Sequence, residues 1–134
     1  KDLMSTNFEV VGPNMSLQEF VNDHLIRTGK RCFLVMENGQ LLGMITPNEV
    51  RGVDSKIWQF KQIGDVMRPV SQIHFVAPDM PAIEALEIMS REDVHQLPVM
   101  ANGHVEGVVT RAHVLEILKA RSELSNISNL PRAA

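Results

Sequence analysis

The sequence predicts an α+β fold built from two β-α-β-β-α repeats, and three observations lead to this prediction. An apolar run, an Asn-Gly pair and a second apolar run occupy residues 32–45 and recur at 96–109, with Val35 matching Val99 (99 − 35 = 64). In both copies a threonine follows the second run and opens a helical pattern. The 134 residues are enough for one domain with a proper hydrophobic core.

Each copy opens with a lead-in, a short β-prone run and an amphipathic helix. In the first copy the capping box Ser16-Leu17-Gln18-Glu19 predicts a helix over about residues 16–27. In the second copy Pro81 stands in a first helical turn, where its missing N–H costs nothing, and predicts a helix over about 81–91. The lead-ins and β-prone runs are Asp2-Leu3-Met4 with residues 8–11, and Asp65-Val66-Met67 with residues 73–76.

The two Asn-Gly pairs predict β-hairpins, because both positions of a two-residue type I′ turn need φ > 0. Each hairpin ends at a threonine that can cap the next helix. Thr46 precedes a short helix that Gly52 weakens, and Thr110 precedes a longer helix expected over 111–121. The predicted hairpin tips are Asn38-Gly39 and Asn102-Gly103.

The repeats define the expected domain organisation. We expect the first repeat with its linker at residues 1–62, the second repeat at 63–121 and a frayed tail at 122–134. The linker at 54–64 is mixed polar and aromatic, and we expect a tether with some packing of its own. The strands are apolar almost throughout, and a unit of about 60 residues is too small to bury both faces of its sheet. We therefore expect the two repeats to pack sheet to sheet with pseudo-two-fold symmetry.

Charge and composition exclude several classes of function. Thirteen Lys and Arg against sixteen Asp and Glu give a net charge of −3 with no basic run, which argues against a nucleic-acid partner. The lone Cys32 excludes an internal disulfide, and we expect it to be buried and inert. No stretch approaches the roughly 18 apolar residues of a spanning helix, and the start carries no signal peptide. We expect a soluble, cytoplasmic piece of a longer chain.

The sequence carries no recognisable catalytic or metal-binding motif. The five histidines show no H-x-x-x-H spacing, so no dedicated zinc site is expected. No nucleophile with a base, and no pair of carboxylates, stands in a recognisable catalytic motif. A small enzyme is therefore the least favoured class, behind a ligand-sensing regulatory module and a dimerisation scaffold.

In this order of motifs the chain resembles tandem cystathionine-β-synthase (CBS) domains. The resemblance is carried by the paired lead-ins and by Val76-Ala77-Pro78-Asp79, Leu97-Pro98-Val99, Gly43-Met44-Ile45-Thr46 and Gly107-Val108-Val109-Thr110. It implies a regulatory pair that binds adenine nucleotides or related adenosyl compounds in two clefts between the repeats and that dimerises into a disc.

A narrower resemblance, through residues 16–21 and Arg31, is to the C-terminal CBS pair of site-2-type membrane zinc proteases. It implies a covalently attached effector domain and a membrane-anchored parent chain with this module on the cytosolic side. The His-Glu-x-x-His motif of such a protease does not occur in this sequence.

In the CBS family the strand-to-helix junction carries a Thr or Ser facing phosphate or ribose and, three residues later, an Asp that accepts the ribose hydroxyls. Here Glu49 and His113 stand in the place of that Asp. Glu49 has an alternative role, because Thr46, Pro47 and Glu49 fit a capping box. His113 cannot complete such a box and could contact a nucleotide; the alternative is a solvent-facing histidine.

Two arginines add to the candidate site. Arg111 follows Thr110 at a helix N-terminus, where backbone N–H groups and a guanidinium could hold a phosphate together, and Arg68 could act likewise; the alternative for both is an exposed arginine. The Thr110 site is expected to favour an anionic nucleotide, AMP, ADP or ATP, below about pH 6.5. An empty-cleft homodimerisation scaffold is the alternative function. The candidate ligand-binding residues are Thr46, Glu49, Arg68, Pro98, Thr110, Arg111 and His113.

Overall fold

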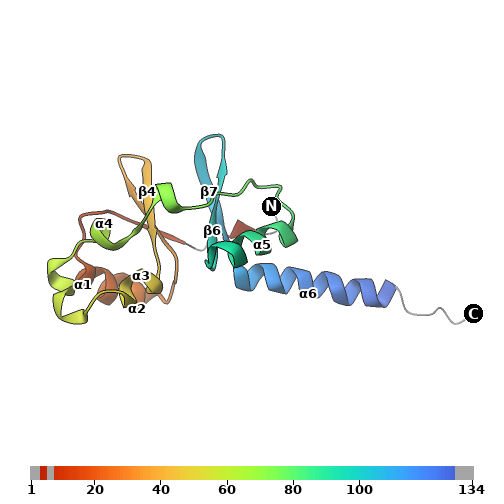
Figure 1. Ribbon diagram of the computed structural model, residues 1–134, viewed down its shortest axis with the longest axis horizontal. Helices are drawn as coiled ribbons and strands as arrows, with labels where there is room; N and C mark the ends of the chain where they lie inside the picture. Colours follow the sequence, from red (N-terminus) through yellow and green to blue (C-terminus); the bar gives the residue numbers. More distant parts are fainter. Residues whose placement is uncertain (1–3, 6–7, 129–134) are drawn as a thin grey trace, which may run out of the picture. The chain divides into compact units, whose positions relative to one another are not determined.

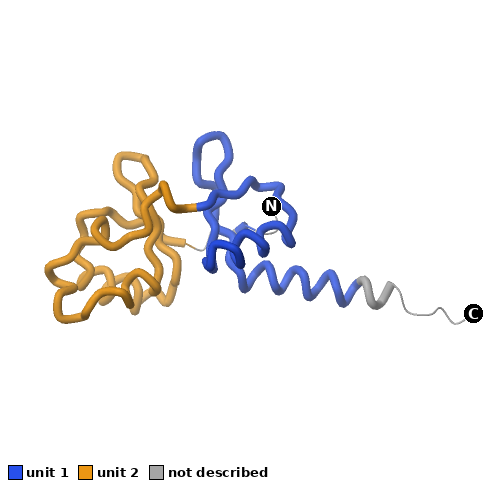
Figure 2. Tube along the Cα trace, viewed as in Figure 1, with its two compact units in different colours: residues 1–6, 74–134 blue, residues 7–73 orange. Residues whose placement is uncertain are grey.

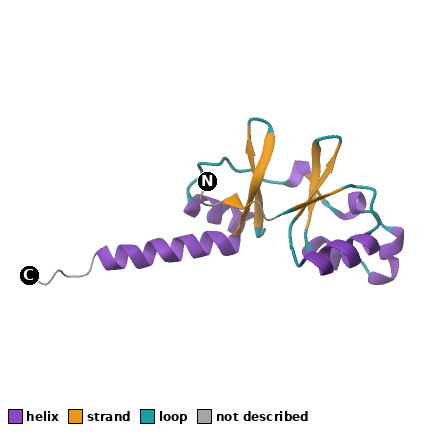
Figure 3. Ribbon diagram, turned by 180° about the vertical axis from the view of Figure 1, so that it is seen from behind, coloured by secondary structure: helices purple, strands orange, loops and turns teal. Residues whose placement is uncertain are grey.

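The protein, seen in a computed structural model, is described over residues 4–5 and 8–128 and consists of two compact units (Figures 1 and 2). Unit 2 comprises residues 7–73, and unit 1 comprises residues 1–6 and 74–134. Both units combine strands with helices, as the colours of Figure 3 show. The predicted α+β class is therefore confirmed.

Unit 2 contains a four-stranded sheet in the order β2-β3-β4-β5. β2 runs parallel to β3, whereas β4 is antiparallel to both β3 and β5. The strands are β2 (Glu9–Val11), β3 (Phe33–Glu37), β4 (Gln40–Ile45) and β5 (Arg68–Pro69). The helical segments are α1 (Leu17–Phe20), η1 (Val21–Leu25), α2 (Ile26–Thr28), α3 (Pro47–Arg51), η2 (Ser55–Phe60), α4 (Ile63–Val66) and η3 (Val70–Gln72).

The first helix of unit 2 joins α1, η1 and α2, and its middle turn, η1, is a π-helix. Ser16 caps its start, because Ser16 Oγ accepts a hydrogen bond from the amide of Glu19 at 3.1 Å. Gly29 ends it in the left-handed conformation, with φ 70°. The helix predicted over 16–27 is confirmed, and the π-helical turn is a feature that the sequence pattern did not predict.

Unit 1 contains a three-stranded antiparallel sheet in the order β1-β7-β6. Two helices, α5 and α6, contribute side chains to the same core as this sheet. The elements are β1 (Met4–Ser5), α5 (Ala82–Glu92), β6 (Gln96–Ala101), β7 (His104–Thr110) and α6 (Arg111–Ser128).

Each unit has its own hydrophobic core. In unit 2 the Phe20 ring meets Phe33 edge-on, with ring centroids 4.8 Å apart, and both side chains are fully buried. In unit 1 the residues of the buried core cluster come from α5, α6, the hairpin strands and the bridge position at Val76. They are Val76, Ala82, Ala85, Met89, Leu97, Val99, Val109 and Val114.

Both predicted hairpins are confirmed. Asn38 and Gly39 have φ values of 54° and 78° between β3 and β4, and Asn102 and Gly103 have 54° and 79° between β6 and β7. Both pairs therefore occupy the positive-φ region that a type I′ turn needs. The pairing register also shifts at the same place in each hairpin, after Val35 and after Val99.

The lead-ins are exchanged between the sequence repeats. β1, from the first lead-in, pairs with β7 through Met4 opposite Val109, while β5, from the second lead-in, pairs with β4 through Arg68 opposite Met44. The compact units therefore do not coincide with the sequence ranges 1–62 and 63–121. Asp2 and Leu3, the other residues of the first lead-in motif, lie outside the described residues.

Two sequence predictions are wrong. Residues 73–76 do not form a strand like β2; only Val76 forms a bridge, to Val99, because the turn η3 precedes the segment and Ala77-Pro78 follows it. The helix after Thr110 does not end at residue 121 but continues to Ser128. The stretch 119–128 holds no Gly or Pro, so nothing in it stops a helix. The frayed tail expected from residue 122 is thus helical to Ser128, and 129–134 lie outside the described residues.

We predict that Gly43→Ala destabilises the protein strongly. An alanine Cβ at this position would lie 2.4 Å from the carbonyl oxygen of Arg68 and 2.7 Å from Sδ of Met67. Because the first contact is with backbone of the paired strand, relief requires the strands to separate, and the free energy of unfolding should fall by at least about 1–3 kcal/mol. Gly12→Ala is the matched control, since its Cβ would meet nothing within 4 Å. Equal urea midpoints for the two variants would contradict the prediction.

Candidate functional site

The junction in unit 2, where β4 meets α3, is closed by its own side chains. Glu49 Oε1 accepts hydrogen bonds from the amide of Thr46 at 2.7 Å and from Thr46 Oγ1 at 2.8 Å. Thr46 Oγ1 in turn accepts from the amide of Asn48 at 3.2 Å. Thr46 is buried, at 4% exposure. The predicted capping box is confirmed, and the hydroxyl and carboxylate that a ribose would need are bonded to each other.

A buried thiol lies near this capping box. Cys32 precedes β3 and is 6% exposed. Burial, together with the negative charge of Glu49, raises the pKa of the Cys32 thiol from 9.0 to about 12. The thiol therefore stays protonated at neutral pH, which agrees with the expectation that Cys32 is buried and inert.

The junction in unit 1, where β7 meets α6, is built differently. Thr110 Oγ1 accepts a hydrogen bond from the amide of His113 at 3.2 Å, and the amide of Arg111 donates to the carbonyl of His95 at 2.8 Å. Two amides of the first turn are thus engaged within the protein, so a phosphate here would depend chiefly on side chains. Arg111 is exposed, whereas Thr110 and His113 are half-buried.

Two further candidates lie on β5 and β6, the strands that pair with β4 and β7. Arg68 is half-buried and stands opposite Met44 on β4. Pro98 is buried and stands opposite Val108 on β7. The seven candidates therefore divide between the units: Thr46, Glu49 and Arg68 in unit 2, and Pro98, Thr110, Arg111 and His113 in unit 1.

His95 is a site residue that sequence reasoning missed. Its carbonyl accepts from Arg111, and its neighbour Gln96 pairs with Thr110, so His95 lies beside the junction of unit 1. The side chain is exposed. The sequence repeat could have identified His95, because it lies 64 residues after Arg31 (95 − 31 = 64) and both residues precede a hairpin. Unit 1 thus places His95 and Arg111 at one junction, and His113 follows Arg111 by two residues on α6.

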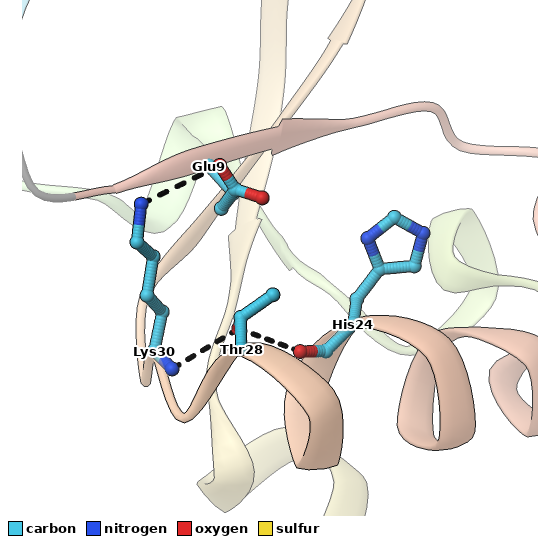
Figure 4. A network of polar contacts seen from close by, with 4 residues as sticks. All are labelled: Glu9, His24, Thr28 and Lys30. Carbon is cyan, nitrogen blue, oxygen red and sulfur yellow. Dashed lines mark hydrogen bonds and ion pairs between the residues drawn. The ribbon is translucent and has the colours of Figure 1, made fainter.

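A polar network elsewhere in unit 2 has a structural explanation (Figure 4). Thr28 Oγ1 donates to the carbonyl of His24 at 2.6 Å and accepts from the amide of Lys30 at 3.1 Å. Lys30 Nζ lies 3.5 Å from Glu9 Oε2 on β2. These bonds close the C-terminal end of the first helix and tie the following turn to the sheet.

The described part of the chain holds neither a candidate metal site nor a candidate membrane span. Residues 4–5 and 8–128 contain no group of three or more His, Cys, Asp or Glu side chains that could hold a metal ion. Over the same residues no helix combines the length and apolar character needed to cross a membrane.

Comparisons with known proteins point to one family. Residues 1–55 and 63–120 match the CBS domain. A protein of Synechocystis sp. named as a zinc metalloprotease is 24% identical over 122 residues, which are 89% of this chain and 32% of that protein. The chain thus spans about a third of that relative's length.

Solved structures share the fold. The structure of CBSX2 in complex with AMP has a TM-score of 0.75 and 22% identity, covering 90% of this chain and 96% of that one. The cytosolic domain of the Mg²⁺ channel MgtE, in complex with ATP, has a TM-score of 0.69 and 23% identity, covering 86% of this chain and 46% of that one.

We predict that Cys32 makes the protein lose stability at alkaline pH. The folded thiol keeps its proton up to about pH 12, whereas in the unfolded chain it ionises near the ordinary value of 9.0. Between these values the unfolded state binds fewer protons, so the free energy of unfolding falls as pH rises, by up to about 1.4 kcal/mol per pH unit. The stabilisation by the protonated Cys32 thiol is fully present below pH 9.0, the ordinary pKa of the thiol in the unfolded chain.

Urea unfolding of the parent protein and of Cys32→Ala, measured between about pH 8 and pH 11, tests this prediction. The free energy of unfolding should fall more steeply with pH in the parent than in Cys32→Ala. The two proteins share all other titrating groups, so the difference reports on Cys32. Parallel declines in the two proteins would show that Cys32 does not titrate as described.

Proposed function

The chain belongs to the CBS domain family, and we propose that it is a regulatory CBS pair that senses an adenine nucleotide at the Thr110 junction of unit 1. The ligand class is supported by the two relatives solved with AMP and with ATP. The choice of junction rests on one contrast between the two copies. In unit 2 the Thr46 hydroxyl and the Glu49 carboxylate are bonded to each other, whereas unit 1 has no carboxylate three residues after Thr110 and carries the exposed Arg111 at the start of α6.

The side chains at this junction suit the phosphates of AMP, ADP or ATP. The Arg111 guanidinium is exposed and presents several N–H donors in a fixed fork, which matches phosphate oxygens. His95 and His113 are the other candidate contacts, because an imidazole N–H can donate a hydrogen bond to a phosphate oxygen. Neither can accept two ribose hydroxyls as a carboxylate does, so binding is weak.

The residues of unit 2 form a weaker candidate site. A ligand there would have to break the bonds between Thr46 and Glu49, and the remaining candidate, Arg68, is half-buried and held in a strand pair. Removing a buried hydrogen-bond partner costs about 1–3 kcal/mol. We therefore assign the nucleotide to unit 1.

The ligand signal acts on an effector domain attached to this module in the same chain, and that domain is a membrane zinc protease with the module on its cytosolic side. The support is the zinc-metalloprotease relative, in which the matched region is about a third of the protein. Sequencing the gene upstream of Lys1 tests this part. A preceding region without a His-Glu-x-x-His motif would contradict it.

The module also forms a homodimer through helices. α5 and α6 carry exposed apolar side chains, Ile83 at 55% and Leu115 at 39%, on a small unit whose core is already filled by other residues. A dimerisation scaffold without a ligand is the second candidate function. In unit 2 the capping box favours this scaffold function, because the polar groups of Thr46 and Glu49 are hydrogen-bonded to each other without a ligand.

We predict that AMP, ADP and ATP bind through Thr110. Isothermal calorimetry at about pH 6 and about pH 8 should show tighter binding at the lower pH, because protonated imidazole attracts phosphate. Thr110→Ala should weaken binding by about ten- to a hundredfold, whereas Thr46→Ala, the matched control in the other copy, should leave it unchanged. Loss of binding in Thr46→Ala alone would reverse the assignment. Absence of binding at both pH values would favour the scaffold.

We predict a homodimer in solution. Light scattering at high micromolar concentration should give twice the 15.0 kDa mass of one chain. The mass of a single chain under these conditions would contradict the dimer and would leave the nucleotide assignment to be judged by calorimetry alone.

A further inference from the structure

The segment η2 of unit 2 exposes two apolar side chains on one face. In a 3₁₀-helix the side chains at positions i and i+3 lie above one another, so Ile57 and Phe60 share a face of η2. Ile57 is 39% exposed, and Phe60, at 74%, is the most exposed large apolar residue in the described part of the chain. Trp58, which stands between them in the sequence, packs on the core of unit 2 instead. η2 therefore presents an apolar face to solvent.

This face has a defined shape, because η2 is fixed to the rest of unit 2 at both ends. The indole N–H of Trp58 donates a hydrogen bond to the carbonyl of Val53 at 3.0 Å. Directly after the helix, the carbonyl of Lys61 accepts a hydrogen bond from the amide of Leu17, at the start of α1, at 2.7 Å. In Figure 1 the segment is the yellow-green loop beside α1. A surface that is ordered in advance loses little conformational entropy when it binds.

Two lysines stand on either side of the apolar pair. Lys56 precedes Ile57 and Lys61 follows Phe60, and both lysines are exposed. Residues 55–64 contain these two basic residues and no acid, so the rest of the chain carries a net charge of −5 (−3 − 2 = −5). This stretch is thus locally basic in an acidic protein.

The two aspartates that bound the stretch cap the helices that follow them. Asp54 Oδ1 accepts a hydrogen bond from the amide of Lys56 at 3.0 Å, and Asp65 Oδ2 accepts one from the amide of Gln62 at 3.1 Å. The backbone N–H groups offset part of the negative charge of each carboxylate. The residues next to the apolar pair in the sequence are therefore basic.

We propose that η2 contacts the surface of a membrane that contains anionic lipids. Ile57 and Phe60 enter the boundary between headgroups and acyl chains, and Lys56 and Lys61 lie among the headgroups. Apolar side chains flanked by lysines suit this boundary, because the apolar groups leave water while the ammonium groups stay in it. Each lysine near an anionic surface strengthens binding by about fivefold, so anionic lipid is favoured over neutral lipid.

A second copy of this chain fits the surface less well than a membrane does. A two-fold contact places the same residues of both copies together, so the two lysines of one chain would meet those of the other. Residues 55–64 hold no acid that could offset this repulsion.

The membrane contact goes beyond the proposed function, which gives η2 no role. It rests on that proposal in one respect: a membrane-anchored parent would hold the module beside a bilayer, where even a weak contact forms because the effective concentration is high. The contact itself belongs to this chain and can be measured without the parent.

Vesicle binding tests the proposal. The chain should sediment with vesicles of equal parts phosphatidylcholine and phosphatidylserine at least about tenfold more tightly than with phosphatidylcholine alone, and added salt should weaken this binding. Phe60→Ser should weaken it by at least about tenfold. Lys56→Gln combined with Lys61→Gln should abolish the preference for phosphatidylserine. Equal binding of the parent to both kinds of vesicle, or no binding to either, would overturn the proposal.

Val10→Ser is the matched control. Val10 is also an exposed apolar residue of unit 2, at 54%, but it lies beside the acidic Glu9, so this variant should bind like the parent. Circular dichroism checks that every variant folds. A Phe60→Ser variant that binds vesicles like the parent would contradict the assignment. A change in the mass of the protein caused by Phe60→Ser would show that the face joins two copies instead.

Trp58 provides a measurement that needs no variant, because it is the only tryptophan of the chain and belongs to η2. Lipids brominated in their acyl chains should quench its fluorescence in the mixed vesicles. Vesicle binding without quenching would mean that another face is in contact, and would overturn the role of η2. Failure of vesicle binding leaves the proposed parent and nucleotide site standing, whereas a parent without a protease region leaves the vesicle result standing.

Discussion

The left-handed Asn-Gly turns are the constraint on which both units depend. Asn38 and Asn102 each adopt a φ of 54°, and the glycine that follows each of them is also left-handed. Such a turn fixes which residues of the two strands face each other, and a slip of one residue would turn every buried side chain outward. With the register fixed, Thr46 directly follows β4 and Thr110 ends β7, a helix begins after each threonine, and both strands present an edge to a lead-in.

The two copies share this backbone and differ in the chemistry of the junction. In unit 2 a glutamate three residues after the threonine returns to it and satisfies the start of the helix, which stabilises the fold by about 1 kcal/mol and uses the groups that a ribose would need. In unit 1 a histidine stands at that position and leaves the threonine with one amide donor from the turn. One residue type thus decides whether the same junction serves stability or can serve recognition.

The features predicted from the sequence are those determined by residues near each other in the chain. The hairpin tips, the cap at Thr46 and the helix at 16–27 all follow from motifs of a few residues. The exchange of lead-ins could not be predicted, because two similar apolar strands compete for each lead-in and no local signal chooses between them. His95 was missed for the same reason, since its place beside Thr110 arises from strand pairing. The length of α6 was underestimated because the dense apolar positions end at Leu118, although no Gly or Pro stops the helix before Ser128.

The π-helical turn in the first helix of unit 2 accommodates a difference in length between the two sequence copies. Val11 pairs in parallel with Val35 in the first copy, and Val76 pairs in parallel with Val99 in the second. Val11 and Val76 are 65 residues apart, whereas their partners Val35 and Val99 are 64 residues apart. The first copy therefore holds one extra residue between these points. In a regular α-helix one extra residue rotates all the following side chains by about 100° around the helix axis. The side chains at the end of the helix would then point away from the sheet. The wider π-helical turn at Val21–Leu25 accommodates the extra residue instead, so the rotation does not occur. The strands keep their pairing, and Asp23 and Arg27 correspond to Glu87 and Arg91 of α5 at the same 64-residue separation as the hairpins.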